Sequence, residues 1–314
     1  MSLTESAPRT AEADVPQTRR VRGRALRRNA SWWFVLPAAA FFIFVMIVPS
    51  VRGVRYAFTD WDGISRTVHD VGFKQFRALL HDPSATGAIE HTLLIAAAIT
   101  VIQNGIGLLL ALAVHTHIKS RNVLRVFLFA PAVITPVATA YLWKYMLAPT
   151  GAINGLLGSL GLKSLRQDWL GNPSIALWSV VAVVVWQFAG YSMVIFLAGL
   201  QGIPDEVLEA SAIDGAGRWT KFWYVVRPYL APALTINITL SVIGGLKLFD
   251  QVWVMTNGGP GHATETMSTL IYKNAFQFNE FAYSIAMAVV LTIFVAVLSG
   301  TQYGLMARQR GTVG

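Results

Sequence analysis

The sequence predicts an all-α membrane protein with six transmembrane helices, and two observations support that prediction. Only 13% of the 314 residues are charged, about half of the share that is usual in soluble domains. The charges are also clustered, and they leave six uncharged runs, at residues 29–51, 91–118, 126–143, 169–204, 228–246 and 281–307. Since a transmembrane helix needs roughly 20 mostly apolar residues, each run can supply most or all of one span.

The spans follow one another along the chain with short polar loops between them. The first is placed at 32–51 and is too long for the apolar core of a signal peptide. The other five are placed, in order, at 91–114, 126–147, 174–199, 231–254 and 282–304. After the first span, residues 73, 76, 79 and 80 are apolar, which is the spacing of a short amphipathic helix. We therefore predict a disordered basic tail at 1–30 and a transmembrane domain at 31–314.

Basic residues gather on one side of this arrangement. The two tails and the loops after the second and fourth spans hold 15 of the 25 Lys and Arg residues: Arg9, Arg19, Arg20, Arg22, Arg24, Arg27, Arg28, Lys119, Arg121, Arg125, Arg218, Lys221, Arg227, Arg308 and Arg310. Because basic loops stay preferentially in the cytoplasm, we expect both termini to be cytoplasmic. Nucleic-acid binding is the weaker interpretation of the net charge of +9, since no folded basic domain is available for it.

Motifs that carry chemistry are missing from the sequence. It has no cysteine, which excludes disulfides and thiolate chemistry, and it has no Gly-rich phosphate-binding loop followed by Lys and Ser or Thr. No His and carboxylate cluster shows the spacing of metal ligands, and no nucleophile elbow is found. We therefore expect no catalytic residue, no metal and no cofactor bound by this chain.

A polar segment from Glu209 to Gly217 separates the fourth and fifth spans. Pro204 and the two acidic residues after it favour the start of a helix, because acids stabilise the positive end of the helix dipole. Gly215 favours its end. We expect a second short helix, capped by Asp214, to carry Trp219, Phe222 and Trp223 before Pro228.

This segment resembles the cytoplasmic coupling loop of bacterial ABC importer permeases. The match is carried in order and spacing by Glu209, Ala210, Asp214, Gly215, Ala216, Phe222, Pro228 and Pro232. Ser211 stands where Ala is usual in that family, and Val225 where Ile is usual. The resemblance implies a type I ABC importer fold, with a coupling loop at about 201–230 that docks into a cleft on an ATPase subunit. The expected ATPase-coupling residues are Glu209, Ala210, Ser211, Ala212, Asp214, Gly215, Ala216, Phe222 and Pro228.

The resemblance covers nearly the whole chain after residue 30. Over that length the chain is similar to the carbohydrate-uptake, maltose-type group of these permeases. It is carried by residues 196–201, 249–250, 256–260 and 263–266, followed by Tyr272 and residues 275–276. His91 departs from it by standing where Asn is common. Such a permease lies in the bacterial cytoplasmic (inner) membrane and pairs with a second, homologous permease. Two ATPase subunits use ATP and Mg, and an extracytoplasmic solute-binding protein delivers a sugar, here an oligosaccharide or related polyol.

Polar and aromatic residues within the fourth and fifth spans are the candidates for solute contact. Charges inside a span are costly, so they face a cavity or a partner. Lys247 and Asp250 are three residues apart, which places them on one predicted helix face as either an ion pair or a pathway lining. Aromatic rings and amides within the spans suit contact with a saccharide. The remaining candidate positions are implied by the resemblance to the permease family. The expected substrate-pathway residues are Val184, Gln187, Phe188, Tyr191, Leu240, Gly244, Lys247 and Asp250.

Two alternatives stay open at this point. The positive charge of Lys247 is also compatible with an anionic solute, such as a phosphorylated polyol, or with another small polar solute. An ion-coupled secondary carrier would need buried carboxylates within its spans, and Asp250 is the one candidate.

Overall fold

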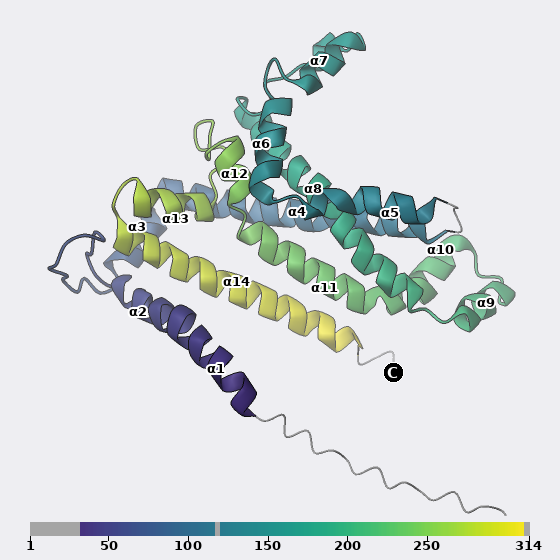
Figure 1. The fold of residues 1–314 in the computed structure, drawn as a ribbon, viewed down its shortest axis with the longest axis horizontal. Helices are drawn as coiled ribbons and strands as arrows, with labels where there is room; N and C mark the ends of the chain where they lie inside the picture. Colours follow the sequence, from purple (N-terminus) through teal and green to yellow (C-terminus); the bar gives the residue numbers. More distant parts are fainter. Residues whose placement is uncertain (1–31, 117–119, 311–314) are drawn as a thin grey trace, which may run out of the picture. The chain divides into compact units, whose positions relative to one another are not determined.

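The structure is a computed structural model that describes residues 32–116 and 120–310 and is mostly helical in those ranges (Figure 1). The predicted disordered tail at 1–30 lies outside the described residues. The chain divides into two units, residues 1–50 and 51–314. The first unit contains α1 (Trp32–Phe42), a π-helix (Ile43–Ile47) and the beginning of α2 (Val48–Tyr56). Residues 35–56 form a helix long and apolar enough to cross a membrane, so the first predicted span is confirmed and extended.

The second unit contains four long helices, each of which corresponds to a predicted span. They are α4 (Pro83–His115), α8 (Pro173–Gln201), α11 (Arg227–Leu246) and α14 (Phe281–Arg310). The shorter helices are α3 (Lys74–His81), α5 (Arg121–Phe129), α6 (Pro136–Met146), α7 (Ala152–Ser159), α9 (Asp205–Ile213), α10 (Arg218–Lys221), α12 (Asp250–Met255) and α13 (Met267–Phe276). Among the described residues, five helices are long and apolar enough to span a membrane, and a bent pair raises this number to six. The predicted fold class and the amphipathic helix near residue 76 are thereby confirmed.

Small residues let the central helices pack closely. A Cβ atom added at Gly107 on α4 would lie 2.6 Å from the Cβ of Ser192 on α8. At Gly245 on α11 it would lie 2.6 Å from the Cα of Ala96 on α4. The amide of Gln103 also donates to the Ser192 hydroxyl at 2.9 Å. Close backbone approach and hydrogen bonds between helices replace the hydrophobic driving force that is missing inside a membrane, so α8 becomes the most buried span.

The third predicted span is bent sharply rather than straight. Its two arms, residues 121–133 and Pro136–Met146, are inclined by 96°. Pro136 has no backbone N–H to continue the first arm, and the residue before it, Thr135, takes the extended conformation that a following proline favours. Figure 1 shows α6 turning away from α5 as a result. The expectation of a single helix at 126–147 is therefore wrong.

The fifth predicted span is interrupted as well. α11 ends at Leu246, residues 247–249 are not helical, and α12 begins at Asp250. Two consecutive glycines lower the helix propensity just before this end, and the Thr266 hydroxyl donates to the carbonyl oxygen of Leu248 at 3.2 Å. The expectation that Lys247 and Asp250 share one face of a continuous helix is wrong, because the two residues flank the interruption.

The loop between α2 and α3 is ordered by its own carboxylates. Asp62 accepts hydrogen bonds from the Ser65 hydroxyl at 2.6 Å, the Ser65 amide at 2.7 Å and the Ile64 amide at 3.0 Å. These bonds, led by that from the hydroxyl, lower the pKa of Asp62 to about 2. Hydrogen bonds from His69 lower the pKa of Asp60 in the same loop. Both carboxylates are therefore charged at neutral pH.

Candidate functional site

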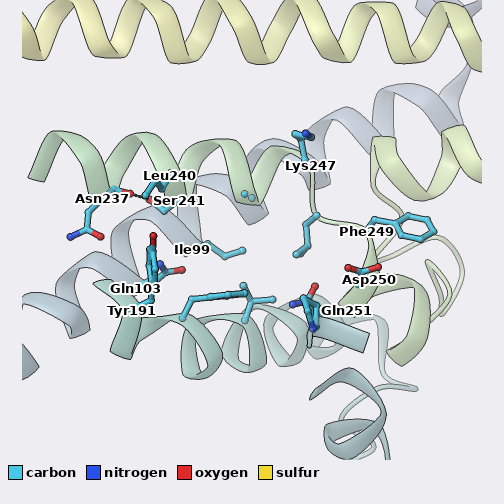
Figure 2. A pocket seen from close by; sticks show the side chains of 16 residues that line it. Ile99, Gln103, Tyr191, Asn237, Leu240, Ser241, Lys247, Phe249, Asp250 and Gln251 are labelled. Atoms are coloured by element: carbon cyan, nitrogen blue, oxygen red, sulfur yellow. Dashed lines mark hydrogen bonds between the residues drawn. The ribbon is translucent and has the colours of Figure 1, made fainter. Parts of the chain in front are cut away.

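The two interrupted spans meet at one cavity of about 330 Å³ in the second unit (Figure 2). Non-helical backbone at membrane depth is tolerated where it is buried in protein or lines a cavity. Here Pro136 follows one interruption, and Leu248 and Phe249 form the other, and all three line the cavity. Lys247, also in the second interruption, lines the cavity too. The remaining lining residues come from α4, α8, α11 and α12: Ile99, Gln103, Val184, Phe188, Tyr191, Asn237, Leu240, Ser241, Gly244, Gly245, Asp250 and Gln251.

Seven of the eight predicted substrate-pathway residues lie in the lining of this cavity. They are Val184, Phe188, Tyr191, Leu240, Gly244, Lys247 and Asp250. A Cβ at Gly244 would meet no atom within 4 Å, so this glycine leaves open space on the cavity side of α11. The structure thus brings together residues that the sequence placed on two different spans. Their direct contact with a solute stays a prediction.

The eighth residue, Gln187, lies behind the lining. Its side chain is fully buried, and its amide donates to the carbonyl oxygen of Ile134 at 2.9 Å. Its amide oxygen accepts a bond of 3.0 Å from Gln251, which does line the cavity. Gln187 therefore joins the bend of the third span to the start of α12. This bridge provides a hydrogen bond for the Ile134 carbonyl at the bend of the third span. It also positions the Gln251 side chain beside the interruption at 247–249.

Four polar lining residues were missed in the sequence: Gln103, Asn237, Ser241 and Gln251. Three of them are hydrogen-bonded around α8 and α11: Gln103 donates to the Ser192 hydroxyl at 2.9 Å, Asn237 to the Ser192 carbonyl at 3.2 Å and the Ser241 hydroxyl to the Asn237 carbonyl at 2.9 Å. A signal for two of them was present, because residues 237, 240, 241 and 244 are spaced like one face of a helix.

The two charged residues of the cavity do not pair with each other. No ion pair joins Lys247 and Asp250, both of which belong to the described part of the chain. Figure 2 shows the amine of Lys247 directed away from the carboxylate of Asp250. The open alternative of a mutual ion pair is therefore wrong in this conformation, and both charges are free to meet a solute or a partner.

A second candidate site is α9 with the turn that ends it. The helix stops in a Schellman motif, in which the amide of Ala216 donates to the Ser211 carbonyl at 3.0 Å and that of Gly215 to the Ala212 carbonyl at 3.1 Å. This motif requires a left-handed residue after the helix, and Gly215 has a φ of +74°. The predicted end of the first short helix is confirmed.

The residues expected to couple to an ATPase mostly face outward on α9 and its turn. Glu209, Ala210, Ala212, Asp214 and Gly215 are exposed, whereas Ser211 is buried. The Ser211 hydroxyl donates to the carbonyl of Leu208 at 2.8 Å. The Lys221 amine donates to the same carbonyl at 3.1 Å and so ties α9 to α10.

Two expectations about this segment are wrong. Residues 218–246 run as one helix that includes a π-helical stretch, Phe222–Val226, so the second short helix is the first part of the fifth span. Phe222 and Pro228 are half-buried within that helix. Asp214 is the C-cap residue that follows α9 and does not cap α10, because Gly217 is the residue that precedes α10.

Within 32–116 and 120–310, no group of three or more His, Asp or Glu side chains lies close enough to hold a metal ion.

Several apolar spans, a cavity at two helix interruptions and a short helix outside the spans define a polytopic membrane protein of the permease class. Residues 103–311 match the family described as "Binding-protein-dependent transport system inner membrane component". This match covers more than half of the chain, and the protein belongs to that family. It is thus a multi-pass transport subunit of the inner membrane rather than an enzyme.

Relatives in this family match over almost their full length. The chain is 35% identical to the probable starch degradation products transport system permease protein AmyD of Thermoanaerobacterium thermosulfurigenes, over 86% of this chain and 91% of that protein. It is 31% identical to the multiple sugar-binding transport system permease protein MsmF of Streptococcus mutans, over 89% and 96%. A bacterial ABC transporter that imports the acidic polysaccharide alginate contains a chain of the same fold, with a TM-score of 0.78 and 21% identity, over 89% of this chain and 95% of that one.

Proposed function

We propose that this chain forms half of the translocation pathway of an ATP-driven sugar importer, with the cavity at the two helix interruptions as the solute site. The observation that carries the proposal is the composition of that cavity. Phe188 and Tyr191 offer aromatic faces, while Gln103, Asn237 and Gln251 offer amides. Sugars stack their apolar C–H faces on rings and form hydrogen bonds through their hydroxyls, so this combination suits a saccharide.

The names of the relatives support the same solute class. AmyD is described as a permease for starch degradation products and MsmF as one for multiple sugars. We infer an oligosaccharide or related polyol as the solute, delivered by an extracytoplasmic binding protein. A second, homologous permease would complete the pathway.

The ATPase contact is assigned to α9. Ile213 at the end of α9 is 86% exposed, and Trp219 on the neighbouring α10 is 77% exposed. Exposed apolar side chains with a polar rim are typical of protein interfaces, and α9 is tied to the fifth span through Lys221. Movement of α9 by an ATPase subunit would reach α11 and the cavity through this connection. ATP and Mg would be bound by that subunit, because this chain has no phosphate-binding loop.

A decisive test is transport by the reconstituted assembly of two permeases, two ATPase subunits and the binding protein. Tyr191→Leu removes a ring that lines the cavity, whereas Tyr191→Phe keeps it. We expect only the leucine variant to raise the KM for sugar import, by about fivefold if the ring supplies about 1 kcal/mol. Equal effects of the two variants would contradict stacking on this ring. Import that persists without ATP and collapses with the ion gradient would favour a secondary carrier instead.

The charge of Lys247 separates neutral from anionic solutes. If the solute is a phosphorylated polyol, Lys247→Ala should abolish its import and leave neutral sugars unaffected. Unchanged import of every candidate solute by this variant would remove Lys247 from the pathway.

A further inference from the structure

The loop that joins α12 to α13 contains residues in the left-handed backbone conformation, which is unfavourable for most residues. Asn257 and His262 have φ values of 51° and 65°, and Gly258 and Gly261 lie in the same left-handed region at 80° and 55°. Residues other than glycine pay a steric penalty there. The two non-glycine residues keep this conformation only if surrounding contacts hold the loop, which points to a role for its shape.

A buried carboxylate at the centre of this loop supplies those contacts. Glu265 is 1% exposed, and its carboxylate pairs with the Lys273 amine at 2.5 Å. The same amine donates to the carbonyl of Asn257, a left-handed residue, at 2.9 Å. Gly258 is required beside the carboxylate, because a Cβ there would lie 2.5 Å from its oxygen. A buried charge that loses its partner is strongly destabilising, so the pair holds the loop in one conformation.

A chain of hydrogen bonds leads from this carboxylate to the wall of the cavity. The Thr269 hydroxyl donates to Glu265 at 2.6 Å, and the Thr266 amide donates to the Thr269 oxygen at 2.9 Å. The Thr266 hydroxyl in turn donates to the carbonyl of Leu248 at 3.2 Å. Leu248 belongs to the interruption at 247–249 and lines the cavity. The loop thus satisfies a backbone group that the end of α11 leaves without a helical partner.

The loop is also fastened to α4. The Nδ1 atom of His91 lies 3.2 Å from the carbonyl oxygen of Glu265 and donates to it, and the amide of Met267 donates to the Thr92 hydroxyl at 2.9 Å. The loop therefore has a fixed support on one side and the interruption on the other.

We propose that Glu265 is a positioning residue for the cavity. Its pairing with Lys273 locks residues 256–266, and through Thr269 and Thr266 it fixes the interruption that presents Lys247 and Asp250. The use of this geometry in solute binding rests on the proposed function, whereas the link between loop and interruption does not.

Two measurements on the reconstituted assembly test this proposal. Hydrogen exchange of the amides at 246–250 reports the interruption without any solute, and import kinetics report the cavity. For Glu265→Gln we expect exchange to accelerate about tenfold in the loop and at 246–250, the factor that corresponds to 1.4 kcal/mol. Exchange in α9 should be unchanged. The KM for import should rise in parallel, with the maximal rate altered much less.

His262→Asn is the matched control. Its imidazole lies 3.3 Å from the same carboxylate but is exposed, and Asn tolerates the left-handed backbone. We expect this variant to behave like the wild type. If Glu265→Gln does not assemble, Lys273→Met removes the same ion pair from its less buried side and should give the same two effects.

The outcomes separate this proposal from the proposed function. Acceleration confined to 256–266, or no acceleration anywhere, would overturn the positioning role, as would an unchanged KM despite faster exchange at 246–250. If amide exchange accelerates both in the loop and at 246–250, but the assembly imports no sugar, the sugar proposal is refuted and the structural link between loop and interruption stands.

Discussion

Replacement of Gly215 isolates the contribution of one backbone conformation to the proposed ATPase contact. The residue has a φ of +74°, and a Cβ built on it meets no atom within 4 Å. Space around the position is therefore open in this chain, and only the left-handed conformation demands glycine. A bulky side chain as such should therefore be tolerated at this position.

Leucine and asparagine form a matched pair for this test, because they have the same number of side-chain heavy atoms. An ordinary L-residue costs about 1–2 kcal/mol in the left-handed region, whereas asparagine adopts it more readily. Gly215→Leu should thus weaken the Schellman motif by that amount, while Gly215→Asn should retain most of it. Since most of α9 is exposed and it is held by few contacts, among them the packing of Leu208, buried Ser211 and the bond from Lys221, local stability has little reserve. A loss of this size changes the population of the native turn by a factor of about 5–30.

The assay is ATP hydrolysis stimulated by the loaded binding protein, measured in proteoliposomes at equal amounts of inserted permease. We expect Gly215→Leu to lower stimulated hydrolysis and ATPase association by a factor in that range, with insertion unchanged. Gly215→Asn should stay within about twofold of the wild type, as a cost of a few tenths of a kcal/mol implies. Equal losses in both variants would show that side-chain size matters rather than backbone conformation. Full activity of the leucine variant would refute the argument.

Three other changes probe the rest of the molecule. A Cβ at Gly190 would lie 1.9 Å from the carbonyl oxygen of Leu128, so Gly190→Ala should cost about 1–3 kcal/mol of stability and lower the thermal midpoint in detergent. Gly155→Ala, whose Cβ meets open space, is the control, and an equal shift there would contradict close packing. Gln187→Leu leaves the buried amide of Gln251 without its hydrogen bond, at about 1–3 kcal/mol, and removes the bond to the Ile134 carbonyl as well; it should lower the thermal midpoint and raise the KM for import, and an unchanged midpoint would contradict the bridge. For Asp62, whose pKa is lowered from 3.8 to about 2, the carboxylate stabilises its loop above pH 3.8, and this contribution is lost as the pH falls through about 2. Asp62→Asn should therefore speed amide exchange in that loop at neutral pH, with a difference from wild type that vanishes near pH 2, and a difference independent of pH would refute the assignment.

Prediction from sequence succeeded where the signal was local and periodic. The amphipathic helix at Lys74–His81 and the left-handed end of α9 at Gly215 follow from side-chain spacing and from the one residue that adopts positive φ without cost. It failed where tertiary contacts replaced helical bonds. The interruption at 247–249 is stabilised by a hydroxyl from Thr266, which is remote in sequence. The bend at 134–135 is favoured locally by Pro136 and is also stabilised by the amide of Gln187 from another span.

The candidate site shows the same division. Leu240 and Gly244 could be chosen because the resemblance to the permease family implied them, but Gln103 and Gln251 join them only through the packing of α4 and α12. Polar side chains in separate spans carry no pattern that relates them to one another.

The sequence by itself determined that the chain spans a membrane several times and that a polar helix ends at Gly215. Those features arise from long apolar runs and from backbone preferences of single residues, which act over a few turns of chain. Only the tertiary structure decided that two spans are broken and that their breaks share one cavity. Backbone groups without helical hydrogen bonds persist inside a membrane only when side chains from other segments bind them. Those partners are determined by the fold rather than by neighbours in sequence.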